Sequence, residues 1–170
     1  MVRLFVAAWL PADVSDHLAG IDRPIERGVR WMAPESWHIT LRFIGDADSD
    51  EVHGRLTAAT LPRVRVDLGP KVELLGLHQI VIPVAGAESL AAAVRSATTG
   101  IGVDEQRTFR GHLTIARLQP GAHSSIDGSP VSARFDIDEI ALVASDLGSQ
   151  GAVYTTVARY STVPSADDQS

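Results

Sequence analysis

The sequence contains no cysteine, and this absence excludes several kinds of chemistry at once. Without thiols the chain forms no disulfide framework, has no thiolate nucleophile and cannot bind zinc through cysteine ligands. Lysine is almost as scarce, because Lys71 is the single lysine and arginine supplies the remaining basic side chains. We assign this bias no functional weight.

Long apolar runs are also missing. The opening run, residues 1–10, is short, ends at Pro11 and is not followed by a convincing small-residue cleavage site, so it is not typical of a secretion signal. No stretch approaches the roughly 20 apolar residues that a membrane-spanning helix needs. We interpret the opening run as a first β-strand and expect a cytoplasmic protein that does not contact membranes.

The composition is that of an ordinary globular chain. Its 170 residues are 45% hydrophobic and 21% charged, which predicts a folded core in one domain or two closely packed lobes. The net charge of −6 argues against binding polyanions through overall charge. Any nucleic-acid contact must then be local, and five arginines lie near the motifs described next: Arg30, Arg42, Arg107, Arg110 and Arg117.

One short pattern, His-x-Thr-x, occurs twice. The first copy begins at His38 and includes Thr40, and the second begins at His112 and includes Thr114. In an extended strand alternate side chains share a face, so each copy presents one imidazole and one hydroxyl on the same side, with apolar residues on the other. Both copies can therefore contribute to a common cleft.

The remaining patterns predict an α+β chain. We expect strands at residues 4–10, 29–32, 37–44, 64–68, 72–75, 78–84, 108–118, 131–144 and 152–160, and helices at 11–21, 49–60 and 88–98. Residues 119–130 are rich in glycine, serine and proline and are expected to be a loop. The motif histidines are 74 residues apart (112 − 38), and each motif lies in a half with its own helices and strands. This layout indicates a duplicated unit.

Paired imidazoles are suited to acid and base catalysis. The unperturbed pKa of histidine is about 6.5, so two of them facing one substrate can hold opposite protonation states near neutral pH. Such a pair suits in-line displacement at phosphorus, where the attacking oxygen loses a proton and the departing oxygen gains one. The threonine hydroxyls can donate to phosphoryl oxygens, and Arg117 is the nearest guanidinium that can strengthen that clamp.

Two plainer interpretations stand beside this one. Both motifs can be ordinary half-buried strands, because one His-x-Thr pattern is easily expected by chance. The other histidines show no spacing typical of a metal site, so we expect no bound metal and assign them surface or structural roles: His17, His53, His78 and His123. The tryptophans are interpreted as packing residues.

The chain resembles a known family from its first predicted strand to its last. The likeness covers roughly residues 2–160 and involves these stretches: Arg3-Leu4-Phe5-Val6-Ala7, Leu10-Pro11, Arg30-Trp31, Pro34-Glu35, 38–45, Phe109, 112–117, Ser145-x-Leu147 and Gly151-Ala152-x-Tyr154. On these residues the sequence resembles the 2H phosphoesterase superfamily, and within it the bacterial RNA 2',3'-cyclic phosphodiesterase (2'-5' RNA ligase-like) family.

The resemblance implies an α+β fold of two pseudo-symmetric lobes, each an antiparallel sheet backed by helices, with a central cleft. Residues 1–160 would form this single two-lobed domain, and 161–170 a flexible C-terminal tail. We expect a monomer that needs no cofactor and acts on RNA ends or small nucleotides with 2',3'-cyclic phosphate.

The resemblance also implies a reaction, which is metal-independent opening of the cyclic phosphate to a 2'-phosphomonoester. By this likeness His112 activates water, His38 protonates the departing O3', Thr40 and Thr114 hold phosphoryl oxygens, and Arg117 stabilises charge. The resemblance also implies a reversible 2'-5' RNA ligase activity, in which a 5'-hydroxyl takes the place of water. Two alternatives stay open: a noncatalytic RNA-end or nucleotide-binding module, and a phosphodiesterase for another cyclic or 2'-5' linked substrate.

Two details do not fit a regular strand or the family pattern. Arg117 is five residues after His112, so it faces the cleft only if the strand twists or bulges near Ala116. Otherwise Arg42, four residues after His38, is the candidate phosphate ligand. Phe43 occupies the position equivalent to Arg117, where it can stack on a base or pack in the core. Glycine at 111, where similar sequences often have proline, predicts a looser approach to the second motif.

Overall fold

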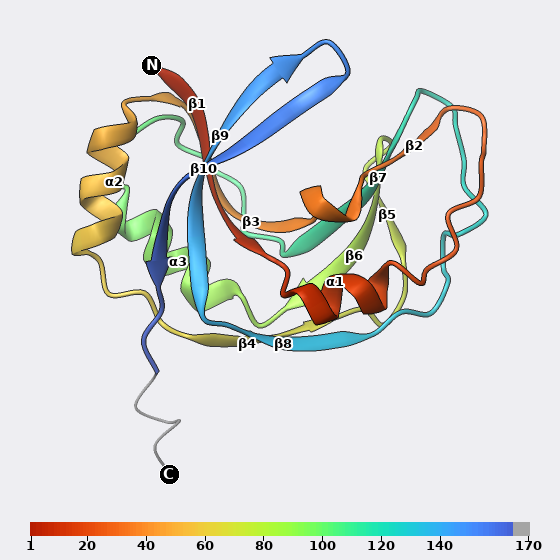
Figure 1. Cartoon of the computed structure of the whole chain (residues 1–170), viewed down its shortest axis with the longest axis horizontal. Coiled ribbons are helices and arrows are strands. Elements are labelled where there is room, and N and C mark those ends of the chain that lie inside the picture. The colour runs from red at the N-terminus through yellow and green to blue at the C-terminus, as the bar shows by residue number, and fades with distance from the viewer. Residues whose placement is uncertain (165–170) are drawn as a thin grey trace.

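A computed structural model describes residues 1–164 of the chain (Figure 1). These residues form ten strands, three α-helices and a short 3-10 helix, η1 (Pro34–Ser36). The strands are β1 (Val2–Trp9), β2 (Val29–Trp31), β3 (His38–Ala47), β4 (Val64–Leu68), β5 (Glu73–Leu75), β6 (Gln79–Ala85), β7 (His112–Leu118), β8 (Ala133–Ile137), β9 (Glu139–Gly148) and β10 (Gly151–Ser161). The helices are α1 (Ala12–Leu18), α2 (Ser49–Ala58) and α3 (Glu88–Ala97).

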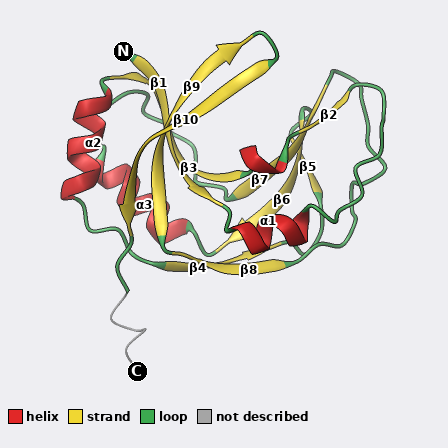
Figure 2. Ribbon diagram, in the orientation of Figure 1, coloured by secondary structure: helices red, strands yellow, loops and turns green. Residues whose placement is uncertain are grey.

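The strands form one curled antiparallel path that divides naturally into two lobes (Figure 2). The first lobe has the strand order β10-β9-β1-β3 and the second has β7-β6-β4-β8. In addition, β2 pairs with β7 and β5 pairs with β6. The lobes meet where β3 and β7 pair, and the paired residues there are Ile39 and Leu113. The expected α+β class with antiparallel sheets is therefore confirmed, and the two motif strands lie side by side at the junction.

Each lobe is assembled from both halves of the sequence. Strand β4 follows the first motif but pairs with β6 and β8 in the second lobe. Strands β9 and β10 follow the second motif, yet β9 pairs with β1 in the first lobe. The helices cross over as well, because α1 packs on β8 and α3 on β3. Neither lobe is a continuous stretch of sequence, unlike the two separate halves that the spacing of the motifs indicated.

Helix α2 begins directly after a capping residue and buries one face. The Asp48 side chain accepts hydrogen bonds from the backbone amides of Asp50 and Glu51, which satisfies two of the free amides at the start of α2. Val52 and Leu56, four residues apart, are its buried positions.

Within residues 1–164 there is no helix with the length and apolar character needed to cross a membrane.

Several boundaries differ from the sequence predictions, including the following three. The segment 131–144 forms two strands, β8 and β9, that belong to different lobes. Residues 108–111 precede β7 rather than belonging to it. The expected tail starts later than 161, because the Thr162 amide donates to the Asp138 carbonyl and the Val163 amide to the Leu61 carbonyl. The rest of that predicted tail, 165–170, lies outside the described residues.

Candidate active site

A large cavity opens beside the junction of β3 and β7. Its volume is about 1000 Å³. Its wall includes every residue that the sequence indicated as a site candidate: His38, Thr40, Arg42, Phe43, His112, Thr114 and Arg117. The two His-x-Thr-x motifs, far apart in the chain, thus contribute to one space.

The two motif histidines are held in the same way. His38 Nδ1 lies 2.7 Å from the Ser36 carbonyl oxygen, and His112 Nδ1 lies 2.8 Å from the Arg110 carbonyl oxygen. A carbonyl oxygen only accepts, so in both rings Nδ1 carries a proton and donates it. The Nε2 atom of each ring is then left to accept or donate a proton in the cavity.

One extra residue in each motif strand changes which side chains face the cavity. In β7, Thr114 pairs with Val81 and Ala116 pairs with Ile80, so Ile115 is an insertion in the ladder. In β3, Thr40 pairs with Ala7 and Arg42 pairs with Val6, which makes Leu41 the insertion. A bulge of this kind reverses the alternation of side chains beyond it.

The bulges bring the residue five positions after each histidine to the cavity. Arg117 and Phe43 line it, as do the histidines and threonines of their own strands. A bulge beside Ala116, one of the alternatives that the sequence left open, is therefore present. The cavity face is asymmetric, because one strand contributes a guanidinium at this position and the other a phenyl ring.

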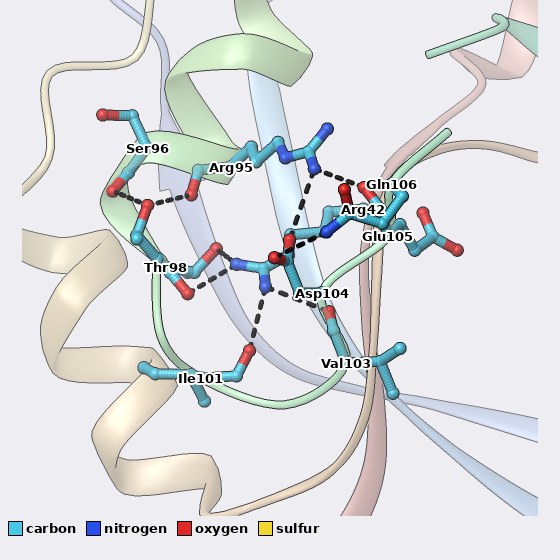
Figure 3. A network of polar contacts seen from close by, with 10 residues as sticks. Arg42, Arg95, Ser96, Thr98, Ile101, Val103, Asp104, Glu105 and Gln106 are labelled. Carbon is cyan, nitrogen blue, oxygen red and sulfur yellow. Dashed lines mark hydrogen bonds and ion pairs between the residues drawn. The ribbon is translucent and has the colours of Figure 1, made fainter. Parts of the chain in front are cut away.

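Arg42 also borders the cavity, but its guanidinium is bound by main-chain oxygens. Its residue is 8% exposed, and its guanidinium donates to the carbonyl oxygens of Thr98 at 2.5 Å and Ile101 at 2.9 Å (Figure 3). Both terminal nitrogens are occupied in this way. The terminal nitrogens of Arg42 are therefore engaged within the protein, whereas Arg117 lines the cavity.

His38 lies in an aromatic enclosure. Its ring centroid is 5.0 Å from that of Phe5, 5.4 Å from that of Trp9 and 5.3 Å from that of Tyr154. Burial lowers the pKa of His38 below its usual value near 6.5, the hydrogen bond to the Ser36 carbonyl opposes this, and the positive charges of Arg117 and His112 add to the lowering. This environment favours the neutral imidazole.

The two threonines differ in their partners. Thr114 Oγ1 donates to Oε1 of Gln79, at 2.9 Å, across the β6–β7 ladder. Thr40 is half-buried in the cavity wall on the other strand. A phosphoryl oxygen that replaces Gln79 as the acceptor of Thr114 would find the hydroxyl already aimed from the motif face.

Phe43 combines the two roles that the sequence left open. On one side it packs with Phe5 in a small apolar cluster, and on the other it lines the cavity. The Arg3 guanidinium lies 5.2 Å from the centre of its ring, a distance typical of a cation–π contact. The ring is thus fixed from behind while it borders the cavity.

Sequence reasoning missed several side chains that shape the site. Phe5 and Trp9 lie on the same face of β1 and contact His38. Their alternation was not recognised in the sequence because nearly all residues of this strand are apolar. Trp9, interpreted as packing, also donates from Nε1 to Thr156 Oγ1 at 3.2 Å. Tyr154 fell within a stretch that carries the family resemblance but was given no site role, and Gln79 gave no local signal, because its partner Thr114 is distant in the chain.

The approach to His112 is tight rather than loose. Gly111 is buried, and a Cβ there would lie 2.4 Å from the carbonyl oxygen of Val84. The Val84 amide also donates to the Gly111 carbonyl at 3.0 Å. The looser approach predicted from glycine at this position is wrong, since the absence of a side chain lets β6 come close.

The other histidines are separate from the motif pair, except that His78 also lines the cavity. His17 Nε2 lies 3.0 Å from the Ser132 carbonyl oxygen, and His53 Nδ1 lies 2.9 Å from the Tyr160 hydroxyl. Across residues 1–164, no three His, Asp or Glu side chains gather in a way that could hold a metal ion.

Comparison with known proteins gives a consistent result. The LigT-like phosphoesterase family model matches residues 9–66. RNA 2',3'-cyclic phosphodiesterase of Bacillus subtilis (strain 168) is 24% identical over 156 residues, covering 82% of each chain. The enzyme of the same name from Thermus thermophilus is 25% identical, covering 94% of this chain and 90% of the relative.

The fold is also similar to that of a solved LigT structure. The crystal structure of Escherichia coli LigT complexed with 3'-AMP superposes with a TM-score of 0.76 at 23% identity, covering 95% of this chain and 98% of that one. At that identity the likeness concerns the fold alone. Residues 9–66 are thus similar in sequence to LigT-like phosphoesterases, and the chain as a whole is similar in fold to LigT.

Proposed function

We propose that this protein hydrolyses 2',3'-cyclic phosphate, at RNA ends or on small nucleotides, to a 2'-phosphomonoester. The observation that carries the proposal is the placement of two imidazoles, each with Nδ1 bound to a carbonyl and Nε2 left for the substrate, in one cavity with Arg117. The relatives named RNA 2',3'-cyclic phosphodiesterase support the choice of substrate.

The reaction needs one base and one acid. We assign His112 as the base: its Nε2 takes a proton from water as the water oxygen bonds to phosphorus. His38 is then the acid, and its Nε2–H protonates O3' as the bond between phosphorus and O3' breaks. The proton gained by His112 and the proton lost by His38 balance over one turnover, so exchange with solvent restores both rings.

The acid role asks for a charged His38, whereas burial favours its neutral form. A bound phosphodiester is an anion, and a negative charge close to the ring favours the imidazolium. Substrate binding thus partly offsets the effect of the aromatic enclosure and favours the protonated form of His38. The same rings then keep water from competing for that proton.

The other side chains supply charge and orientation. Arg117 and the hydroxyls of Thr40 and Thr114 are placed to bind the non-bridging oxygens, whose negative charge grows in the transition state. The protein groups alone therefore provide a base, an acid and charge stabilisation, and we expect turnover to survive metal chelation. We further propose a cytoplasmic monomer, for which the composition is the support.

The test is incubation of adenosine 2',3'-cyclic phosphate with excess EDTA, followed by identification of the product. His38→Ala and His112→Ala should each lower kcat by about 10²- to 10⁴-fold. His123→Ala is the matched control, since this exposed loop histidine lies outside the cavity wall. Undiminished turnover in both motif variants would overturn the proposal, and a 3'-phosphate product would overturn the assigned leaving group.

The same assay separates the alternatives. A noncatalytic binding module would bind the cyclic nucleotide without converting it, and the presence of both imidazoles disfavours this. A phosphodiesterase for another substrate would leave the cyclic phosphate intact but cleave a 2'-5' linked dinucleotide. Reverse ligation is tested with an RNA that ends in 2',3'-cyclic phosphate and a second RNA with a free 5'-hydroxyl.

A further inference from the structure

The Arg42 guanidinium is surrounded by main-chain oxygens of the residues that follow α3 (Figure 3). Its Nη1 donates to the carbonyl and also to the hydroxyl oxygen of Thr98. Its Nη2 donates to the carbonyls of Ile101, at 2.9 Å, and Val103, at 3.3 Å. Thr98 itself is fully buried, and its hydroxyl donates to the Val94 carbonyl.

This cage places the guanidinium at the C-terminal end of α3. Thr98 follows the last helical residue, and the carbonyls beyond it lack partners within the helix. They carry partial negative charge, which a guanidinium neutralises. Burial lowers the pKa of Arg42 and the positive charge of Arg95 adds to this, while the carboxylates of Asp104 and Glu105 oppose it. Such a buried cation is tolerated because its donors are satisfied.

The carbonyls of Ile101 and Val103 belong to the chain that connects α3 to the second motif, residues 99–111, called here the connecting segment, and Thr98 lies immediately before it. Its Val103 amide donates to the Ile44 carbonyl at 2.8 Å. Gly102 has a φ of 67°, and a Cβ there would lie 2.1 Å from that same carbonyl oxygen. The segment thus packs directly against β3, the strand that carries Arg42.

Arg95, on α3, holds the next part of the connecting segment. Its Nη2 donates to Asp104 Oδ1 at 3.4 Å and to the Glu105 carbonyl. Gln106 Nε2 donates to the other carboxylate oxygen of Asp104 at 3.1 Å. Two arginines from different elements therefore fix successive parts of a segment that has no regular secondary structure.

Beyond these clamps the connecting segment becomes a wall of the cavity. Arg107, Thr108, Phe109 and Arg110 all line it. The Arg110 carbonyl accepts the Nδ1–H of His112, so the end of the segment also orients the second histidine. If the connecting segment moved where it contacts Arg42, the positions of these wall residues and of His112 would change as well.

From this geometry we infer that Arg42 is a positioning residue: through the carbonyls of Thr98, Ile101 and Val103 it holds the connecting segment as the nucleotide-binding wall of the cavity. The inference rests on the proposed function. It gives the first motif a second task, because the strand that presents His38 also fixes the segment that leads to His112.

The test compares Arg42→Lys and Arg95→Met with wild type. Lysine keeps the charge of Arg42 but lacks the fork that reaches several carbonyls. Arg95 is about half exposed, so its removal should leave the fold intact. The control is Arg134→Met, an exposed arginine that pairs with Asp67 outside the cavity wall. Hydrogen exchange of amides in 99–111, thermal unfolding and steady-state kinetics with adenosine 2',3'-cyclic phosphate are measured for each.

Both test variants should show faster exchange confined to 99–111, with β4 and β8 unchanged. KM should rise roughly tenfold while kcat changes much less, since the wall positions the nucleotide rather than moving protons. The effects of the double variant should be less than additive, because both arginines act on one segment. Arg134→Met should match wild type.

Two results would overturn the inference. One is uniformly faster exchange with a lower kcat at unchanged KM, which is the signature of a smaller folded fraction. The other is unchanged exchange in 99–111 in both test variants. If wild type does not turn over the cyclic nucleotide, the proposed function fails, and exchange alone then decides the role of Arg42 in ordering the segment.

Discussion

Phe43 and Arg117 occupy the same position on two neighbouring strands, each five residues after a motif histidine and each beyond a one-residue bulge. The bulges at Leu41 and Ile115 turn both side chains toward the same cavity. The one-residue bulge is thus present in both strands, whereas the side chain that it turns toward the cavity differs between them. One strand supplies positive charge and the other an apolar ring, so the two sides of the cavity suit different parts of a nucleotide.

Loss of the guanidinium should weaken the transition state more than the ground state. We expect Arg117→Met to lower kcat by about 10²-fold, because one donor to a developing oxyanion typically contributes this much. Arg117→Lys should retain part of the activity through its charge. Arg30→Met is the control, since Arg30 pairs with Arg117 across the β2–β7 ladder but lies outside the cavity wall. A fall in Arg30→Met as large as that in Arg117→Met would contradict the assigned role.

The phenyl ring should affect binding more than chemistry. In Phe43→Leu we expect KM for adenosine 2',3'-cyclic phosphate to rise about tenfold, the scale of one base-stacking contact. Because Phe43 also packs with Phe5, the variant should lose about 1 kcal/mol of unfolding free energy. Kinetics and urea unfolding on the same preparation separate the two effects. A lower stability with unchanged KM would leave Phe43 as a packing residue only.

The titration of His38 can be measured directly. Burial and the charges of Arg117 and His112 lower its pKa, so its NMR titration midpoint should fall below 6.5. Arg117→Met removes one of these positive charges and should raise the midpoint toward the usual value. A midpoint at or above 6.5 in the wild-type protein would contradict the electrostatic account of the enclosure.

The same shift determines how stability depends on pH. The unfolded chain takes up a proton at His38 near pH 6.5, whereas the folded cavity resists it until lower pH. The stability that neutral His38 contributes is therefore present above pH 6.5 and is lost as the pH falls below it. Urea unfolding at about pH 7.5 and about pH 5 should show a smaller loss for His38→Gln than for wild type.

Much of the fold was predictable because it depends on local signals. The alternating residues 64–68 predicted a strand with the bounds that β4 has, and the helix expected from residue 49 begins there, directly after its cap Asp48. The duplicated motif predicted two strands that meet at one cavity. These features need only neighbouring residues or the period of a single element.

The remaining features depend on contacts between distant residues. The exchange of β4 and β9 between lobes follows from strand pairing, which no local pattern encodes. The bulge at Ile115 was implied by parity, but its location required the register with β6. Arg42 resembled a phosphate ligand in sequence because its carbonyl partners lie more than 50 residues away.

The hydroxyl of Thr114 can be tested apart from its strand. Thr114→Val keeps the shape but removes the donor, and we expect kcat to fall by roughly ten- to a hundredfold. Thr114→Ser should recover most of it. Gln79→Leu removes only the acceptor that the hydroxyl uses within the protein, so its effect should be small. Equal losses in Thr114→Val and Gln79→Leu would show that the contact between the two residues, rather than donation to substrate, matters.

Gly111 offers a test of how the second histidine is placed. A Cβ at this position would lie 2.4 Å from the Val84 carbonyl oxygen, so Gly111→Ala must push β6 and the start of β7 apart. We expect a loss of about 1–3 kcal/mol in unfolding free energy and a clear fall in kcat, because His112 is the next residue. Gly54→Ala is the matched control, since Gly54 lies in α2 with nothing within 4 Å of the added Cβ, and alanine there should raise stability by up to about 1 kcal/mol. If Gly111→Ala matched wild type in both measurements, the close packing of β6 against the second motif would not be what holds His112 in place.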